Sequence, residues 1–208
     1  MNSAAAVILA GLGLPYPCFT AQEPQTASDQ IEIVMERSEN RQWKALDSHT
    51  VVDSGDSVRF RLQASFSGYL YVFYRGSGGE SAWLYPSGTA SNWIEKGTVY
   101  RIPSPSASYR VLGRPGFDVI YWLISAKSLP DREQLPARED RVERTMVPRC
   151  PEIEERAPCV DSRAGVSQSH LSGLRPREIR IEAQGETTRI AAGGQPGVLV
   201  YEFRLAHR

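Results

Sequence analysis

Residues 69–74 have the sequence YLYVFY, and residues 117–125 have the sequence FDVIYWLIS. Both stretches are apolar at nearly every position and rich in aromatic and β-branched side chains. A half-exposed strand alternates between polar and apolar residues, so runs of this kind are typical of strands covered on both faces. We therefore expect two central strands in a sheet that is buried on both sides.

The surrounding segments predict shorter strands separated by turns. Residues 57–65 alternate between apolar and polar side chains, which indicates a strand with one solvent-facing side. The short connection Phe66-Ser-Gly68 favours an antiparallel hairpin between this strand and the next. Regularly spaced strands with Gly and Pro between them predict an all-β fold, an antiparallel β-sandwich of immunoglobulin-like or similar type. The expected strands are 31–36, 57–65, 69–74, 81–85, 98–102, 108–112, 117–125, 177–183 and 197–205.

The N-terminal segment has the pattern of an export signal. Residues 4–14 form an uncharged apolar run with the length of a signal-peptide core, although no Lys or Arg precedes it. We expect residues 1–21 to be a signal peptide and residues 22–30 a flexible linker; a buried N-terminal helix is the alternative. The protein is then extracytoplasmic, periplasmic or secreted, without a membrane span in the mature chain. Cys18 is a candidate lipoprotein anchor, but Pro17 before it fits that signal poorly.

Residues 31–208 are expected to form a single β domain, in which residues 31–130 are the core. Residues 131–176 are dense in Arg and Glu, and we interpret them as a charged, mostly irregular connector rather than a partner-binding arm. The strands expected within residues 177–208 would complete the sheet, because a terminal strand this apolar must pair with an existing edge.

Two cysteines lie in this connector. Cys150 and Cys159 are separated by eight residues, and in an oxidising compartment they predict a disulfide worth ~2–3 kcal/mol. A zinc site is the alternative, but no second cysteine pair or nearby histidine completes four ligands.

The composition and motifs argue against several functions. Lys plus Arg equals Asp plus Glu, 24 against 24, whereas a nucleic-acid binder usually has a basic excess. The turn Gly76-Ser-Gly-Gly79 lacks the Lys-Ser/Thr ending of a phosphate-binding loop and reads as a hairpin turn. No cofactor or metal is predicted, because none of the histidines has a ligand spacing; all three are expected at the surface: His49, His170 and His207.

Carboxylates are the remaining candidates for catalysis. Asp56 and Asp118 each begin a strand, and strand-end geometry can bring two such groups together as an acid/base pair; Glu95 is a further candidate. Asp at the start of a strand is more often a turn former through its own backbone hydrogen bond. We therefore predict no catalytic residues.

Aromatic residues around the loop 86–92 are the candidates for ligand binding. Exposed rings here would stack on a sugar or hold a peptide. The alternative is that Trp83 and Tyr85 are core residues on one face of a strand and that Trp93 caps its edge. The candidate ligand-binding residues are Trp83, Tyr85, Asn92 and Trp93.

Three short motifs occur in a familiar order: Gly55-Asp-Ser-Val-Arg-Phe60, Gly68-Tyr-Leu-Tyr-Val72 and Leu84-Tyr-Pro86. With Ile94-Glu-Lys-Gly97 and the strand that ends before Pro130, the chain over about residues 31–130 resembles the bacterial family called domain of unknown function 4384. The resemblance implies a β-sandwich-like module of bacterial secreted or envelope proteins. It supplies no catalytic residues.

The sequence therefore predicts a non-catalytic binding or scaffolding module outside the cytoplasm, with a protein or envelope glycan as partner. The loops 75–80 and 86–93 are its expected contact surface. A carboxylate-dependent hydrolase acting on an envelope glycan and a purely structural envelope component are the alternatives.

Overall fold

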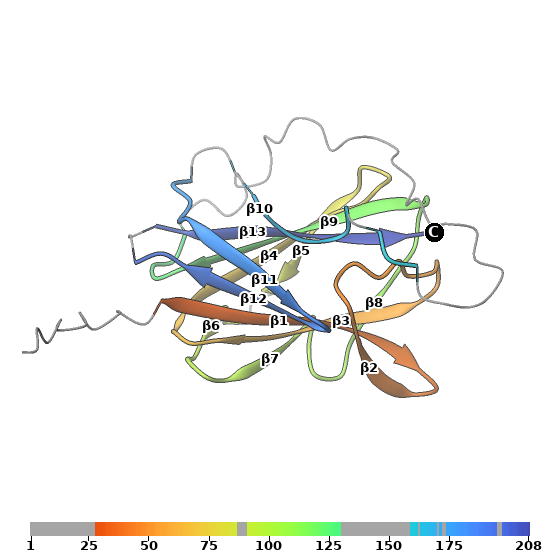
Figure 1. Ribbon diagram of the computed structural model, residues 1–208, viewed down its shortest axis with the longest axis horizontal. Coiled ribbons are helices and arrows are strands. Elements are labelled where there is room, and N and C mark those ends of the chain that lie inside the picture. Colours follow the sequence, from red (N-terminus) through yellow and green to blue (C-terminus); the bar gives the residue numbers. More distant parts are fainter. Residues whose placement is uncertain are drawn as a thin grey trace, which may run out of the picture.

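The computed structural model describes residues 28–86, 91–129, 159–161, 163–169, 171, 174–194 and 197–208. Within these ranges the chain is all β and contains no helix. The strands form two antiparallel sheets that pack face to face and are not closed into a barrel (Figure 1). The predicted antiparallel β-sandwich is confirmed. In the same described ranges, no helix is long and apolar enough to cross a membrane.

The first sheet contains seven strands. Their bounds are Asp29–Glu39 (β1), Gln42–Leu46 (β2), Ser57–Ala64 (β3), Val99–Ile102 (β7), Tyr109–Arg110 (β8), Ile179–Gln184 (β11) and Thr187–Ala192 (β12). The order is β11-β12-β1-β3-β7, while β2 pairs with β1 and β8 pairs with β3. Because β1 and β3 alternate between apolar and polar residues, this sheet has one face in the core and one face toward solvent.

The second sheet contains six strands. Their bounds are Gly68–Arg75 (β4), Ser81–Tyr85 (β5), Trp93–Ile94 (β6), Gly116–Ser125 (β9), Gly165–Gln168 (β10) and Leu199–His207 (β13). The order is β10-β13-β9-β4-β5, and β6 pairs with the start of β4. The two doubly apolar stretches are β4 and β9, which pair with each other and have further strands on both sides, as predicted.

The main core lies between the two sheets and is dominated by aromatic rings. Phe60 of β3 meets Trp122 of β9 and Phe203 of β13 edge to face, with ring centroids 5.4 Å and 5.0 Å apart. A second apolar cluster covers the outer face of the second sheet, where Leu123 is 1% exposed and is packed with Leu171 from the segment after Cys159. Both faces of β4 and β9 are therefore buried.

The predicted hairpin between residues 57–65 and 69–74 is wrong. β3 pairs with β1 and β7, whereas β4 pairs with β9 and β5, so the short connection between them passes from one sheet to the other. In a hairpin, Arg59 and Arg61 would have joined the apolar outer face of the second sheet. In the structure both guanidinium groups lie instead on the outer face of the first sheet, where they pair with Glu36.

The C-terminal segment contributes to both sheets. β13 lies between β10 and β9 and pairs with β9 over nine residues, so it is an internal strand and not an added edge. β11 and β12 form a hairpin that joins the first sheet beside β1. β10 falls within residues 131–176, which we expected to be a mostly irregular connector, and most of that connector lies outside the described residues.

The boundaries at the N-terminus also differ from expectation. Asp29 and Gln30 fall within the predicted flexible linker, but they pair with Ala192 and Ala191 and begin β1. The predicted signal peptide at residues 1–21 and the candidate lipid-attachment residue Cys18 lie outside the described residues. Export therefore stays a prediction.

Candidate functional site

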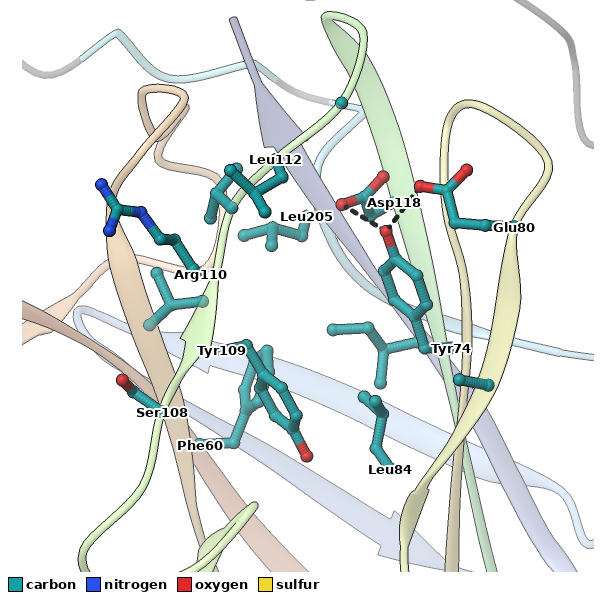
Figure 2. A pocket seen from close by; sticks show the side chains of 15 residues that line it. Phe60, Tyr74, Glu80, Leu84, Ser108, Tyr109, Arg110, Leu112, Asp118 and Leu205 are labelled. Carbon is teal, nitrogen blue, oxygen red and sulfur yellow. Dashed lines mark hydrogen bonds between the residues drawn. The ribbon is translucent and has the colours of Figure 1, made fainter.

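A cavity of about 580 Å³ opens between the two sheets at one end of the sandwich (Figure 2). We call it the intersheet pocket. Small-molecule sites usually have volumes of about 300–1,000 Å³ and mostly apolar walls with a few polar groups. The residues that line it are Val58, Phe60, Tyr74, Glu80, Ala82, Leu84, Ser108, Tyr109, Arg110, Val111, Leu112, Gly113, Asp118, Ile120 and Leu205.

The pocket forms where the edges of the two sheets separate. β8 pairs with β3 over only two residues, and β5 is the last strand of the second sheet. The apolar floor comes from the main core, because Phe60, Ile120 and Leu205 project inward from strands of both sheets. The site therefore rests on central strands, while its mouth is formed by edge strands and turns.

One end of the pocket carries two carboxylates that share a tyrosine. The Tyr74 hydroxyl lies 3.1 Å from Oε1 of Glu80 and 3.3 Å from Oδ2 of Asp118 (Figure 2). Burial, reinforced by the charges of Asp118 and Glu80, raises the pKa of Tyr74 far above its ordinary value. The hydroxyl thus keeps its proton, and because it has only one, it donates to one carboxylate at a time.

The Asp118 carboxylate is held by Tyr74, by Ser77 and by His207. The carboxylate is 3% exposed, and its Oδ1 accepts a 2.8 Å hydrogen bond from the backbone N–H of Ser77. The Nε2 atom of His207 lies 3.2 Å from the same oxygen. The Ser77 hydroxyl in turn donates to the carbonyl of Arg114 at 2.6 Å. These contacts tie the β4–β5 turn to the beginning of β9 and the end of β13.

Ser77, His207 and Asp118 do not form a catalytic relay. In a serine triad the serine and the aspartate bind opposite nitrogens of the imidazole. Here both Ser77 Oγ, at 3.4 Å, and Asp118 Oδ1 face Nε2 of His207. Nδ1 is buried and has no hydrogen-bond partner among the described residues. The geometry assigns His207 a supporting role beneath Asp118.

The glycine-rich turn places Glu80 at the mouth of the pocket. Residues 76–79 form the predicted hairpin turn between β4 and β5, closed by a 2.8 Å hydrogen bond from the Gly76 N–H to the Glu80 carbonyl. A side chain at Gly76 would overlap the Glu80 carboxylate and the Tyr74 hydroxyl. The missing Cβ therefore lets Glu80 fold back toward Tyr74. Arg110 lies at the opposite side of the mouth (Figure 2).

Tyr109 brings a further polar atom to the wall of the pocket. Its ring projects from β8 into the lower part of the view in Figure 2, and its hydroxyl is buried without a hydrogen-bond partner among the described residues. Burial raises the pKa of Tyr109 well above its ordinary value, so the hydroxyl is protonated. Such atoms are uncommon in folded proteins, because a buried hydroxyl without a partner costs stability.

The predicted ligand-binding aromatics lie outside the pocket lining. β5 contains a bulge: Val72 pairs with Tyr85 and Phe73 pairs with Trp83, which leaves Leu84 without a partner. Trp83 therefore packs with the outer cluster, whereas Tyr85 packs against the main core. The alternative that placed both rings on one face assumed a regular strand; the extra residue reverses the alternation.

The other two candidates flank the start of β4. Trp93 is 41% exposed and contacts Tyr69 edge to face, with centroids 4.9 Å apart. The carbonyl of Asn92 accepts a 2.8 Å hydrogen bond from the N–H of Leu70. A role for Trp83, Tyr85, Asn92 and Trp93 in ligand binding stays a prediction.

The three candidate carboxylates have different environments. Asp56 accepts a 3.0 Å hydrogen bond from the Asp53 N–H, which is the turn-forming role expected as the alternative to catalysis. It also forms an ion pair with Arg37. Glu95 is exposed beside β6. Asp118 alone of the three lines the pocket, and its carboxylate partner there is Glu80, which the sequence did not single out.

Sequence reasoning also missed His207, which was expected at the surface but is completely buried. A signal was present, because the inward-facing positions 199, 201, 203 and 205 of β13 predict that residue 207 faces inward as well.

Cys159 is 4% exposed and packs with Val51 and Ala206. Its predicted disulfide partner, Cys150, lies outside the described residues, and the pairing stays a prediction. Among the described residues, no group of three or more His, Cys, Asp or Glu side chains is placed to hold a metal ion.

Comparison with known proteins places the pocket in a family context. Residues 51–128 match the model of a domain of unknown function, DUF4384. The predicted resemblance is confirmed, although the match begins at Val51, so that β1 lies outside it. Every pocket-lining residue except Leu205 lies within this DUF4384 segment. No curated protein and no solved structure matched the chain.

Proposed function

We propose that the protein is a non-catalytic binding module of a bacterial envelope or secreted protein, and that its ligand enters the intersheet pocket. The observation that carries this proposal is the pocket itself. Its volume of about 580 Å³ and its apolar walls suit a small molecule or a large side chain. Tyr74, Glu80 and Asp118 add a few polar groups at one end, which would fix the orientation of the ligand.

The position of the pocket within the fold supports the same proposal. Its floor consists of side chains from central strands, while Glu80 and Leu112 lie on turns at the mouth. A rigid base with variable turns around it is a common arrangement for binding sites. The loop 75–80, expected to be part of the contact surface, contributes Glu80 to this mouth.

Two neighbouring positions on β5 provide a matched test. Ala82 pairs with Tyr74 and lines the pocket, whereas Ser81 pairs with Arg75 and lies on the other side of the strand. Both residues are exposed, so that a tryptophan at either position adds a similar surface. We expect Ala82→Trp to fill the mouth and to abolish binding of fragments that the wild-type protein binds, detected by protein NMR. Ser81→Trp should retain binding.

The outcome separates the binding module from a purely structural component. Fragments that bind the wild type and the Ser81→Trp variant but not the Ala82→Trp variant support the pocket. If no fragment from a diverse library binds, or if binding survives in Ala82→Trp, the pocket is not the ligand site. The structural envelope role would then be the better interpretation.

The extracytoplasmic location is tested separately, by mass spectrometry of the N-terminus of the protein recovered from envelope and periplasmic fractions. A new N-terminus near residue 22 is expected. Recovery of the chain with Met1 intact would contradict export without affecting the pocket.

A carboxylate-dependent hydrolase acting on an envelope glycan is the second candidate. The observation that favours it is the pair of carboxylates, Glu80 and Asp118, at one end of the pocket. Against it, Oδ1 of Asp118 accepts a hydrogen bond from the Ser77 N–H and faces Nε2 of His207, so that only Oδ2 of this carboxylate is directed toward the pocket. Product release from envelope glycans that disappears in Glu80→Gln would support the hydrolase.

A further inference from the structure

The polar end of the intersheet pocket has a deficit of hydrogen-bond donors. Oε1 of Glu80 and Oδ2 of Asp118 both face the single Tyr74 hydroxyl, at 3.1 Å and 3.3 Å. The hydroxyl has one proton and can donate it to only one of the two carboxylate oxygens. The other carboxylate oxygen then faces the hydroxyl oxygen without receiving a hydrogen bond from it. Two carboxylates thus converge on one hydroxyl at the edge of an apolar cavity.

Asp118 cannot relieve this charge by moving into solvent. It is 3% exposed, and its Oδ1 is fixed by the Ser77 N–H and by Nε2 of His207. Oδ2 is therefore held in place beside Tyr74. Glu80 is exposed but folded back over Gly76, so its carboxylate also faces the cavity mouth. The carboxylate oxygens are therefore already in position for a positively charged group, which could bind without rearrangement of the site.

A protonated amine complements this end of the pocket. An ammonium group carries three donors and a positive charge, so one group can donate to Glu80, to Asp118 and to the Tyr74 oxygen. Hydrogen bonds between ions are stronger than those between neutral groups. A neutral alcohol supplies only one donor, and a carboxylate would be repelled by both acids.

The rest of the lining indicates an apolar body behind the charged group. Phe60, Leu84 and Ile120 supply hydrophobic walls. The Tyr109 ring adds to these walls, and its hydroxyl is buried without a hydrogen-bond partner among the described residues.

On these grounds, and resting on the proposed function of the pocket, we propose that the ligand is a small organic cation: an apolar body that bears a protonated amine bound between Glu80, Asp118 and Tyr74. Arg110 is the feature that would favour an anion instead. It is exposed at the opposite side of the mouth, away from the Tyr74 hydroxyl on which the two carboxylates converge. The two possibilities make opposite predictions.

Three probes of equal shape distinguish the charge of the ligand: 4-phenylbutylamine, 4-phenylbutanol and 4-phenylbutyrate. Binding is measured at pH 7 by NMR titration of the full-length chain. We expect the amine to bind about tenfold more tightly than the alcohol, in line with a charge-assisted hydrogen bond, and the carboxylate to bind most weakly. The Ala82→Trp variant should reduce binding of the amine and the alcohol together.

Glu80→Gln tests the acidic end without disturbing the core, because Glu80 is exposed. The amine should lose about tenfold in affinity, and the alcohol, which carries no charge and supplies a single donor, should lose less. Glu95→Gln is the matched control, since Glu95 is an exposed carboxylate outside the pocket lining; it should change neither affinity. Retained dispersion in the NMR spectrum verifies the fold of each variant.

Each contrary result has a distinct meaning. Equal affinities for the amine and the alcohol, or an amine affinity that Glu80→Gln leaves unchanged, would overturn the cation inference and leave the pocket function intact. Tightest binding by the carboxylate, lost in Arg110→Gln, would identify an anion site and overturn it as well. If neither the three probes nor any library fragment shows binding sensitive to Ala82→Trp, the proposed pocket function fails.

Discussion

The outer face of the first sheet is covered by ion pairs, whereas the outer face of the second sheet is covered by other parts of the chain. On the first, Glu36 accepts a 2.6 Å hydrogen bond from Arg59, and the Arg59 guanidinium lies 4.0 Å from the centre of the Trp43 ring. On the second, Leu123 and Val200 pack beneath Leu171 from the segment after Cys159. One face is stabilised locally, and the other depends on distant residues.

This difference shows what a strand pattern reveals about its surroundings. Alternation in β3 correctly predicts a face that needs no cover, because its polar side chains find cross-strand partners. The continuous apolar runs of β4 and β9 correctly predict that both faces are covered, but they contain no information about which segment provides the cover. The comparison can be tested by weakening each face in turn.

The largest effect is expected at the apolar face. Leu123→Ala removes a side chain that is 1% exposed and leaves a cavity, so the free energy of unfolding should fall by about 2–4 kcal/mol in urea denaturation. Leu112→Ala is the control, because Leu112 is 59% exposed and its truncation should have little effect. A loss below about 1 kcal/mol at Leu123 would mean that the covering segment packs loosely.

A smaller loss is expected when the buried ion pair of the first sheet is broken. Glu36→Ala leaves Arg59, which is 8% exposed, without its carboxylate and should reduce the free energy of unfolding by about 1–3 kcal/mol. Arg59→Ala and the double variant complete the cycle. If the losses in unfolding free energy of the two single variants simply add, Glu36 and Arg59 are not coupled, and the ion pairs do not stabilise this face as a unit.

The contact between Arg59 and Trp43 should contribute less. Trp43→Leu keeps an apolar side chain on β2 but removes the ring beneath the guanidinium, with an expected loss of about 0.5–1 kcal/mol. The measurement is the change in the urea midpoint that Trp43→Leu causes in the wild type, compared with the change that it causes in the Arg59→Ala variant. An equal effect in both backgrounds would show that the ring acts through burial alone.

The smallest effect is expected for the exposed pair between β1 and β12. Arg189 and Glu32 are opposite each other at 2.9 Å, but their side chains are 50% and 44% exposed. Arg189→Gln should change the free energy of unfolding by less than about 0.5 kcal/mol, and 1 M salt should remove the difference. A loss as large as that of Glu36→Ala would contradict the dependence of these pairs on burial.

The fold could be predicted to the level of its class and most of its strands. Where residues alternate or run continuously apolar, as in residues 57–65 and 117–125, the expected strands match β3 and β9 closely. β2, β6, β10 and β12 were missed; β6, at Trp93–Ile94, is too short to show a period, whereas β12 has six residues and was not recognised. The partners of β3 and β4 could not be obtained from a three-residue connection, which joins two strands equally well within a sheet or between sheets.

The candidate site was predictable only in fragments. Asp118 was noticed as a carboxylate at the start of an apolar strand, and the loop that carries Glu80 was expected at a contact surface. Their meeting at Tyr74 depends on the pairing of β4 with both β5 and β9, which no local pattern encodes. The bulge at Leu84 was likewise invisible, and it decides which aromatic residues of β5 face the core.

Because of that bulge, the number of residues in β5 can change by one without changing its register with β4. Because Leu84 has no cross-strand partner and lines the pocket, a chain one residue shorter at this point would keep Trp83 opposite Phe73 and Tyr85 opposite Val72. The change would fall on the wall of the cavity and on the part of the main core that Leu84 contacts. A single-codon deletion or insertion here would therefore reshape the pocket wall without shifting the register of the sheet, a type of change that regular strands do not tolerate.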